Sequence, residues 1–442
     1  MATTYLTRQI SSAGSRKKAT ISLWVKRGSN FGNDQRFFSY ENTSVSNNVT
    51  VFKFSGDSIQ FADQTGGSNN ARYDGTRKLR DNNSWYHFLV KMDTTQSTNT
   101  DRLKVYINGE LQSEASYTYP TQNADLNIGH NANAYIDIGR WRGSNNQYFD
   151  GCISHFHYTD GYAYDASTFG STDSVTGEWK INTSPSITMG TNGFTILKDG
   201  NTITDQSANS NNFTLGAGTL TNTEDCPSNV FATMNPLIRS SNGTFASGNN
   251  KFTTSGGAWG SGFATLGMFN GQGKYYMEFK GASGTKIGYG ISDFKDSGVI
   301  DRTQRGETRY CGEYANSYAY HYGGNFYYNG SSTSTGYDSF TSSNVIGMAV
   351  DMDNLKIYFH KDGVYQDSKN PASNNGYTIV APEGAYLPTI CVEDAGAVAN
   401  FGNGVFDTTA ISSEGTNASG IGKFEYDVPT GYTALSTKGL NE

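Results

Sequence analysis

Residues Asn344 to Tyr365 read NVIGMAVDMDNLKIYFHKDGVY, and this stretch indicates the fold class. Its first part alternates apolar side chains with smaller or polar ones, as a half-buried strand does, at Ile346, Met348, Val350 and Met352. Asp353-Asn354 can reverse the chain, and the alternation then resumes at Leu355, Ile357 and Phe359. Asp362-Gly363 supplies a second reversal before Val364-Tyr365. The stretch therefore predicts a β-meander.

The same pattern occurs far upstream, between Trp85 and Leu111, as WYHFLVKMDTTQSTNTDRLKVYINGEL. Apolar residues alternate again on both sides of a reversal, and Asn108-Gly109 forms the second turn. The segments LKVYINGEL and LKIYFHKDGVY match in order and spacing, with one extra residue at the second turn of the latter. We therefore expect two sheets of one kind in a single chain.

Length and composition agree with two all-β domains. A chain of 442 residues is too long for one ordinary domain and suggests two of about 150 to 200 residues each. Aromatic residues make up 13% and charged residues only 17%, while Gly, Asn, Ser and Thr are abundant. Short aromatic strands joined by Gly and Asn turns give this profile, and long surface helices do not.

Net charge and cysteine spacing limit the classes of partner and the cellular compartment that we expect for this protein. The formal net charge is -7, and the densest basic run, Arg77, Lys78 and Arg80 with Arg72, is read as a solvated loop, so we expect no nucleic-acid partner. No run reaches the length of a membrane helix, and MATTYLTRQISSAG lacks the apolar core of a signal peptide. The four dispersed cysteines show no metal-site spacing and are expected to be free thiols in a reducing cytoplasm.

Residues 1–165 form the first predicted domain. Strands are expected at Ala19–Lys26, Val49–Phe54, Ser58–Phe61, Tyr135–Gly139 and Gly151–Tyr158, besides the first meander. ATISLWVKRG, SWYHFLVKMD, LKVYINGE and IDIGRW…YFDGCISHFHYTDGYA resemble, in that order, the laminin-G-type, concanavalin A-like jelly roll. This resemblance implies a two-sheet antiparallel sandwich.

Residues 166–239 are expected to be an ordered connector. The segment is polar, yet it carries large apolar side chains that a disordered linker would rarely hold, at Trp179, Phe194, Ile196, Leu197, Phe213 and Leu215. The phrases GTNGFTI, DQSANSNNFT and DCPSNVFATMNPL are similar to a segment that recurs in tailed-bacteriophage virion proteins, where it follows a laminin-G-type module. That resemblance favours a virion protein.

Residues 240–442 form the second predicted domain. Strands are expected at Gly273–Lys280, Lys286–Ser292, Leu387–Val392 and Val398–Gly402, with the opening meander between them. A Y-x-E-F strand, an IGYGIS strand, the GMAVDMD…IYFHKDG hairpin and a closing NFG resemble, in this order, a SPRY domain. Both resemblances imply bent two-sheet antiparallel sandwiches, which explains the repeated meander.

No catalytic constellation is expected. Sandwich glucanases need two carboxylates about 5 to 9.5 Å apart, as in an E-x-D-x-E strand, and no such run exists. Asp351 and Asp353 come closest, but they flank a turn that Asp favours. His155 and His157 share one face of a predicted strand and are read as structural rather than metal-binding.

Cofactors are not expected either. Laminin-G-type domains do hold calcium on loop acids, so Asp93, Asp101 and Asp150 are the acids to consider, although no ligand set is assigned to them.

Two aromatic segments are the candidate ligand or interface sites. The first, YCGEYANSYAYHYGGNFYY, supplies Tyr310, Tyr314, Tyr318, Tyr320, Tyr322 and Tyr328. The second is Trp141-Arg142, beside a polar loop at one end of the first sandwich. Exposed tyrosines stack on sugars or form protein interfaces, and buried ones fill the sandwich, so core packing, protein interface and glycan site remain alternatives.

The expected function is that of a non-enzymatic accessory protein on the exterior of a tailed-phage virion, either a capsid decoration or a tail-associated appendage. Its partners would be other virion proteins, in many copies or as a homo-oligomer, after assembly in the host cytoplasm. Neither heptads nor β-helix repeats support a long tail-fibre shaft. A lectin-like binder of host surface glycans is the main alternative, and a polysaccharide-degrading enzyme is the second.

Overall fold

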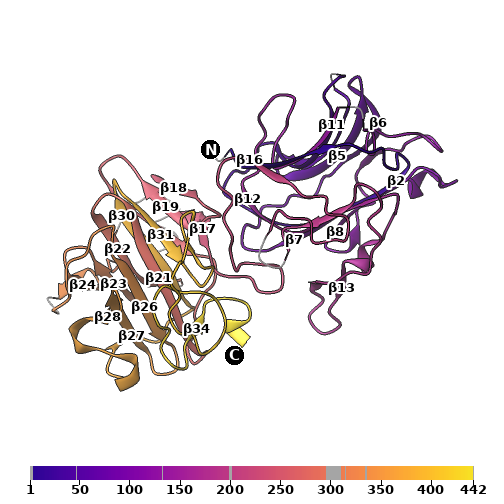
Figure 1. The fold of residues 1–442 in the computed structure, drawn as a ribbon. Helices are drawn as coiled ribbons and strands as arrows, with labels where there is room; N and C mark the ends of the chain where they lie inside the picture. Colours follow the sequence, from indigo (N-terminus) through magenta and orange to yellow (C-terminus); the bar gives the residue numbers. More distant parts are fainter. Residues whose placement is uncertain are drawn as a thin grey trace. The chain divides into compact units, whose positions relative to one another are not determined.

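The computed structural model describes residues 3–45, 47–131, 133–198, 202–294, 310–313, 315–333 and 336–441. Strands dominate this part of the chain, and its helices are short 3-10 turns, so the all-β prediction is confirmed. None of these described helices has the length and apolarity that crossing a membrane requires. The chain divides into two compact units, Met1–Leu220 and Thr221–Glu442, each built mainly from two packed sheets whose strands are antiparallel except for the β21–β34 pair (Figure 1).

The described part of the first unit contains a larger and a smaller sheet. The larger has the order β10 (Ser116–Thr118), β6 (Ser68–Asp74), β5 (Ser58–Thr65), β4 (Val49–Ser55), β3 (Gln35–Asn42), β11 (Ala134–Ile138), β1 (Tyr5–Ile10), β16 (Thr214–Ala217). The smaller has the order β15 (Phe194–Ile196), β12 (Gly151–Asp160), β2 (Lys18–Arg27), β7 (Tyr86–Asp93), β8 (Leu103–Ile107), β9 (Glu110–Leu111). A hairpin of β13 (Gly170–Thr172) and β14 (Trp179–Ile181) and the turns η1 (Asn99–Asp101) and η2 (Ala166–Thr168) complete it.

The first meander pairs as its alternation predicts. In the β7–β8 register, Phe88 lies opposite Ile107, Val90 opposite Val105, and Met92 opposite Leu103. All six side chains are buried in the core between the two sheets. Apolar residues two apart therefore share the inner face, as the period of a strand requires.

Strand β3 was not expected from the sequence, because Phe37 and Phe38 are adjacent and break the alternation. The β3–β4 register shifts between Arg36 and Phe38, which marks a β-bulge. Both rings are 0% exposed, so the bulge allows two consecutive side chains to enter the core.

The predicted connector 166–239 is not a separate segment, and the unit boundary lies inside it, after Leu220. Strand β15 extends the smaller sheet beside β12, and β16 extends the larger sheet beside β1. Ala166, Phe169 and Trp179 cover the outer face of the smaller sheet around Leu89. Phe194, Ile196, Leu197 and Phe213 therefore belong to the core of the first unit, whereas Phe231 and Met234, beyond the boundary, belong to the second.

The second unit also has two large sheets in its described part. One has the order β17 (Met234–Arg239), β20 (Trp259–Ala264), β30 (Tyr386–Glu393), β22 (Lys286–Asp293), β23 (Ser317–His321), β24 (Asn325–Tyr328), β25 (Ser331–Thr333). The other has the order β18 (Gly243–Ala246), β19 (Lys251–Thr254), β31 (Gly396–Asn400), β21 (Lys274–Ser283), β26 (Val345–Asp351), β27 (Lys356–Lys361), β28 (Val364–Tyr365), with β29 (Tyr377–Thr378) on β27 and β34 (Thr433–Ala434) on β21. The smaller elements are β32 (Val405–Phe406), β33 (Thr409–Ala410), η3 (Gln366–Ser368), η4 (Pro371–Ser373) and η5 (Gly439–Asn441).

The second meander forms β26, β27 and β28. Met348 lies opposite Phe359, and Val350 opposite Ile357, all of them buried. Leu355 differs from the prediction, because it lies in the turn with φ of 53° and not in the strand. Asp362 and Gly363 both have positive φ, 48° and 83°, as a tight hairpin turn requires.

The C-terminal segment covers the outer face of the sheet that contains β21 and β26. Phe424, Val428 and Tyr432 pack there with Tyr276 and Tyr358. The buried carboxylate of Glu278 accepts the backbone N–H groups of Glu425 and Tyr426, each at 2.8 Å. A strand acid thus anchors a segment that contributes little sheet pairing of its own.

Candidate binding site

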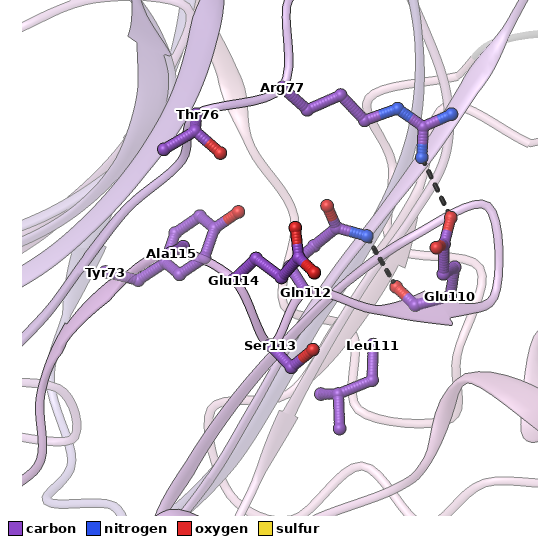
Figure 2. A pocket seen from close by; sticks show the side chains of 9 residues that line it. All are labelled: Tyr73, Thr76, Arg77, Glu110, Leu111, Gln112, Ser113, Glu114 and Ala115. Carbon is purple, nitrogen blue, oxygen red and sulfur yellow. Dashed lines mark hydrogen bonds and ion pairs between the residues drawn. The ribbon is translucent and has the colours of Figure 1, made fainter.

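A polar hollow of about 570 Å³ lies at an edge of the first unit (Figure 2). It forms where the chain leaves β9, at the edge of one sheet, and crosses to β10, at the edge of the other. Its lining comes from the end of β6, the following loop and this crossing: Tyr73, Thr76, Arg77, Glu110, Leu111, Gln112, Ser113, Glu114 and Ala115. Edge strands and loops therefore supply the site, and the core only supports it.

The polar side chains of the hollow are held in a short network. Arg77 Nη1 lies 3.0 Å from Glu110 Oε2, and Gln112 Nε2 donates to the Glu110 carbonyl oxygen at 2.9 Å (Figure 2). The Glu110 and Arg77 side chains are 70% and 47% exposed, so their ion pair contributes little to stability and stays accessible to a ligand.

The chemistry of the hollow suits a neutral, hydroxyl-rich molecule. Hydroxyl, amide, guanidinium and carboxylate groups offer both donors and acceptors. Leu111, 42% exposed, adds one apolar surface. One cation faces two carboxylates, Glu110 and Glu114, which disfavours an acidic ligand.

Tyr73, which lines the hollow, contacts two further tyrosine rings in series. The rings of Tyr73 and Tyr117 lie 5.0 Å apart, and those of Tyr117 and Tyr119 are parallel at 5.0 Å. Burial raises the pKa of Tyr73 to about 12, so its phenol stays neutral. Apart from the basic loop at Arg77, no sequence pattern predicted this hollow, because its residues come together only through the β6–β10 pairing.

The structure corrects the idea that Tyr318 and Tyr320 form an exposed binding face. Their exposures are 3% and 0%, and they pack against Tyr386, Phe340 and Phe359 inside the second unit. The reason is that this face of β23 is directed into the core of the second unit, where both tyrosines belong to its main apolar cluster.

The other tyrosines of that segment lie at its margin. Tyr322 and Tyr328 are half-buried against the same core, and Tyr328 stacks on Tyr318 at 4.7 Å. Tyr310 is half-buried too and contacts Trp259 and His321. Tyr314 lies outside the described residues.

Trp141 and Arg142 take part in two cation–π contacts on the larger sheet of the first unit. The Arg36 guanidinium lies 4.3 Å from the Trp141 ring centre, and that of Arg142 lies 3.9 Å from the ring centre of Tyr135. Arg142 Nη2 also bonds Asp137, a buried acid, at 2.8 Å. Both residues are only partly exposed, and their contacts describe a structural role.

The two histidines of β12 do not share a face. The register shifts between Ser154 and His157, and His155 has φ of 46°, so a bulge separates them. His157 Nδ1 lies 2.9 Å from Thr195 Oγ1 in a buried site. Within the described residues, no cluster of three or more His, Cys, Asp or Glu side chains could hold a metal ion.

The acids considered at sequence level contact protein donors. Asp351 accepts the N–H groups of Asp353 and Asn354 at 3.1 and 2.9 Å, so it holds the turn. Of the calcium candidates, Asp93 accepts from Thr95 and Gln96, Asp150 accepts from Asn30, and Asp101 pairs with Lys104. Calcium binding stays a prediction.

Comparison with known families assigns both units. Residues 2–167 match the family described as the concanavalin A-like lectin/glucanases superfamily, and residues 272–404 match the SPRY domain. The chain carries a concanavalin A-like domain followed by a SPRY domain. The SPRY match includes β21, β22 and the second meander.

Solved structures are similar to parts of this chain at low identity. A human SPRY domain is 16% identical, covers 36% of this chain and 94% of its own, with a TM-score of 0.28. The SPRY domain of human HERC1 is 18% identical, with coverages of 38% and 96% and a TM-score of 0.28. A heptameric SAP-like pentraxin from Limulus polyphemus is 16% identical, with coverages of 39% and 77% and a TM-score of 0.30. Among curated proteins, none matches the sequence.

Proposed function

We propose that this chain is a non-enzymatic attachment protein on the exterior of a tailed-phage particle, as a capsid decoration or a tail-associated appendage. The phage setting comes from the similarity of GTNGFTI, DQSANSNNFT and DCPSNVFATMNPL to a segment of tailed-phage virion proteins. The domain pair supports attachment, because each sandwich presents sheet edges and loops on a rigid core.

The proposal that this protein is not an enzyme is supported mainly by the buried carboxylates, which bond to other groups of the protein. Asp63 accepts from Asn70 Nδ2 and from the Asn127 backbone N–H, both at 2.9 Å. Asp137 joins two arginines, and Glu278 anchors the C-terminal segment. These acids hold loops in place, whereas glycan hydrolysis needs a pair of acids directed at a substrate cleft.

The carboxylates of the hollow also suit binding better than hydrolysis. Glu110 is solvated and paired with Arg77. A general acid in a glycosidase keeps its proton at neutral pH because an apolar enclosure raises its pKa. An exposed, ion-paired carboxylate lacks that enclosure.

Purified particles test the attachment role. Gradient-purified virions should contain the protein, at hundreds of copies for a shell protein or about a dozen or fewer for a tail protein, as the symmetry of each location requires. Quantitative mass spectrometry against the major capsid protein gives the copy number. A protein that stays in the infected-cell extract and is missing from washed particles would overturn the proposal.

Glycan binding through the hollow is the second candidate function, because its polar lining and exposed Leu111 suit a sugar. On an array of neutral host-derived glycans, we expect weak binding that Arg77→Ala lowers at least about tenfold, equivalent to about 1.4 kcal/mol. Lys78→Ala is the matched control, since Lys78 is an exposed neighbouring cation outside the lining. An equal loss of binding in both variants, or no binding by the native protein, would reject this site. Glycan chains that become shorter during incubation would instead indicate an enzyme.

A further inference from the structure

Two cysteines far apart in the sequence meet above Gly288 in the SPRY domain. Cys391 on β30 and His321 on β23 both lie opposite Gly288 in the strand registers. The sulfur atoms of Cys311 and Cys391 each lie 3.6 Å from the Gly288 carbonyl oxygen, so the two thiols share one acceptor, and both belong to the same buried cluster. Gly288 makes the room, because a Cβ there would come within 2.8 Å of Cys391 Sγ.

The pair is enclosed by aromatic rings. Cys311 is 1% exposed and Cys391 0%. Trp259 and Tyr310 pack against the cluster of Cys311, Ala319 and Cys391, and both ring centroids lie 5.5 Å from that of His321. Burial raises the pKa of the Cys311 thiol, so this thiol rests in its protonated form.

The two cysteines differ in how firmly the backbone holds them. Cys391 lies inside β30, which is paired with β20 on one side and β22 on the other. Cys311 lies in a turn outside the strands, and its carbonyl oxygen is 2.8 Å from His321 Nε2. The Cys311 side can therefore adjust to the short sulfur–sulfur bond while the sheet stays unchanged.

We propose that Cys311 and Cys391 form an oxidisable dithiol that closes to a disulfide when the protein meets a peroxide. One of the two cysteines, as its thiolate, attacks a peroxide oxygen. The O–O bond breaks, and this cysteine becomes a sulfenic acid. The second thiol attacks that sulfur and displaces its oxygen as water. Two thiols and one hydrogen peroxide thus give one disulfide and two waters, with two electrons passing from sulfur to oxygen.

The expected consequence is a covalent tie between the Tyr310–Glu313 turn and the centre of the sheet. Such a bond closes a long loop and restricts the unfolded chain, so it raises stability. This inference does not rest on the proposed phage setting, because only the geometry within the SPRY domain carries it.

Peptide mapping of the full chain tests the proposal directly. The protein is treated with dithiothreitol or with hydrogen peroxide, denatured, alkylated and digested without reduction. After peroxide we expect a linked peptide pair containing Cys311 and Cys391, two hydrogens lighter than the sum of its parts, with a rise in Tm of about 5 to 10 °C that dithiothreitol reverses.

Variants assign the cross-link. Cys391→Ala should abolish both the linked peptide and the Tm rise, whereas Cys226→Ser should retain them, because Cys226 lies outside this cluster. The native protein alone decides the matter if a variant fails to fold. Full alkylation of Cys311 and Cys391 after peroxide, oxidation that stops at sulfinic acid, or a cross-link to Cys152 or Cys226 would each overturn the proposal.

Discussion

His87 and His157 both contact the ring of Phe169, with centroid distances of 6.2 and 5.5 Å. Burial lowers the pKa of each to about 3, so both stay neutral in the folded domain. His87 Nε2 is bonded to Ser22 at 2.9 Å, and its Nδ1 accepts from Trp179 Nε1 at 3.1 Å. No motif pointed to this cluster, since its members come from separate segments of the chain.

Acid should therefore destabilise the concanavalin A-like domain through these histidines. Their stabilising contribution is complete above pH 6.5 and is lost as pH falls toward the folded pKa, because only the unfolded chain takes up the protons. In His87→Gln, the slope of unfolding free energy against pH should decrease by about 1.4 kcal/mol per unit between pH 6.5 and about 4. Urea unfolding at several pH values measures it, with half-buried His130→Gln as control, and an unchanged slope in His87→Gln would contradict it.

In the SPRY domain, two opposite pKa shifts meet at Tyr276. Its hydroxyl lies 3.1 Å from Glu278 Oε1 and 2.6 Å from His360 Nε2. Burial raises the pKa of Glu278 to about 7, although the Glu425 and Tyr426 N–H groups oppose this, and burial lowers the pKa of His360 to about 4. Between pH 4.5 and 6.5, the folded domain holds its proton on the acid, and the unfolded chain holds it on the imidazole.

Because both states bind one proton at this pair, its contributions to pH dependence should cancel. Glu278→Gln removes the proton that the folded domain holds on this acid, so only the His360 contribution remains. The free energy of unfolding should then decrease by about 1.4 kcal/mol for each unit by which pH is lowered between pH 6.5 and 4.5. His360→Gln should show the reverse, with stability falling as pH rises. Native-state hydrogen exchange on β21 and β26 peptides measures both, and identical slopes in the two variants would contradict the cancellation.

At the level of elements, alternation located the strands of both meanders, and turn residues located their reversals. Alternation failed at bulges, where Phe37 and Phe38 both turn inward and His155 separates from His157. A bulge is defined by the pairing of two strands, so the sequence of one strand alone does not predict where a bulge forms. The predicted exposure of the tyrosine segment was wrong for a related reason. Alternation places Tyr318 and Tyr320 on one face of a strand, but it does not show whether the rest of the protein covers that face.

Two hairpin turns of the first unit, Gly109 after β8 and Gly66 between β5 and β6, offer a matched pair of glycine substitutions. Gly109 has φ of 78°, and a Cβ there would lie 2.3 Å from Trp179, whereas Gly66 has φ of 56° with nothing within 4 Å. Gly66→Ala should cost about 1 kcal/mol from backbone strain alone. Gly109→Ala should cost about 2 kcal/mol more, because the Trp179 ring must move. Equal losses in thermal or urea unfolding would show that Trp179 does not constrain this turn.

At the level of the whole molecule, composition and repeated pattern predicted two sandwiches, but the boundary between them could not be read from polarity. Phe194, Ile196 and Phe213 belong to the core of the first unit, although the surrounding sequence is as polar as a linker. Only the pairing of β15 with β12 and of β16 with β1 shows where they belong.

Truncation tests this boundary. A fragment ending at Leu220 should fold, because it retains β15 and β16. One ending at Asp165 loses Phe194, Ile196 and Phe213 from the core, and at about 3 kcal/mol or more for each large side chain it should be unfolded or nearly so. Circular dichroism and thermal melts distinguish the two, and a cooperative melt of the shorter fragment near the temperature of the longer one would contradict the assignment.

The hollow beside Arg77 lies where a few residues, 112–115, carry the chain from β9 to β10. The Gln112 N–H donates to the Val105 carbonyl oxygen of β8 at 2.9 Å, but the four residues belong to no strand. Insertions in such a crossing cost little conformational free energy. If the proposed glycan binding takes place here, a change in length or side chains at this one crossing would alter the ligand while the sandwich beneath it stays the same. Under that proposal, variants selected for a new glycan should carry changes between Leu111 and Ser116 before they carry any in the sheets.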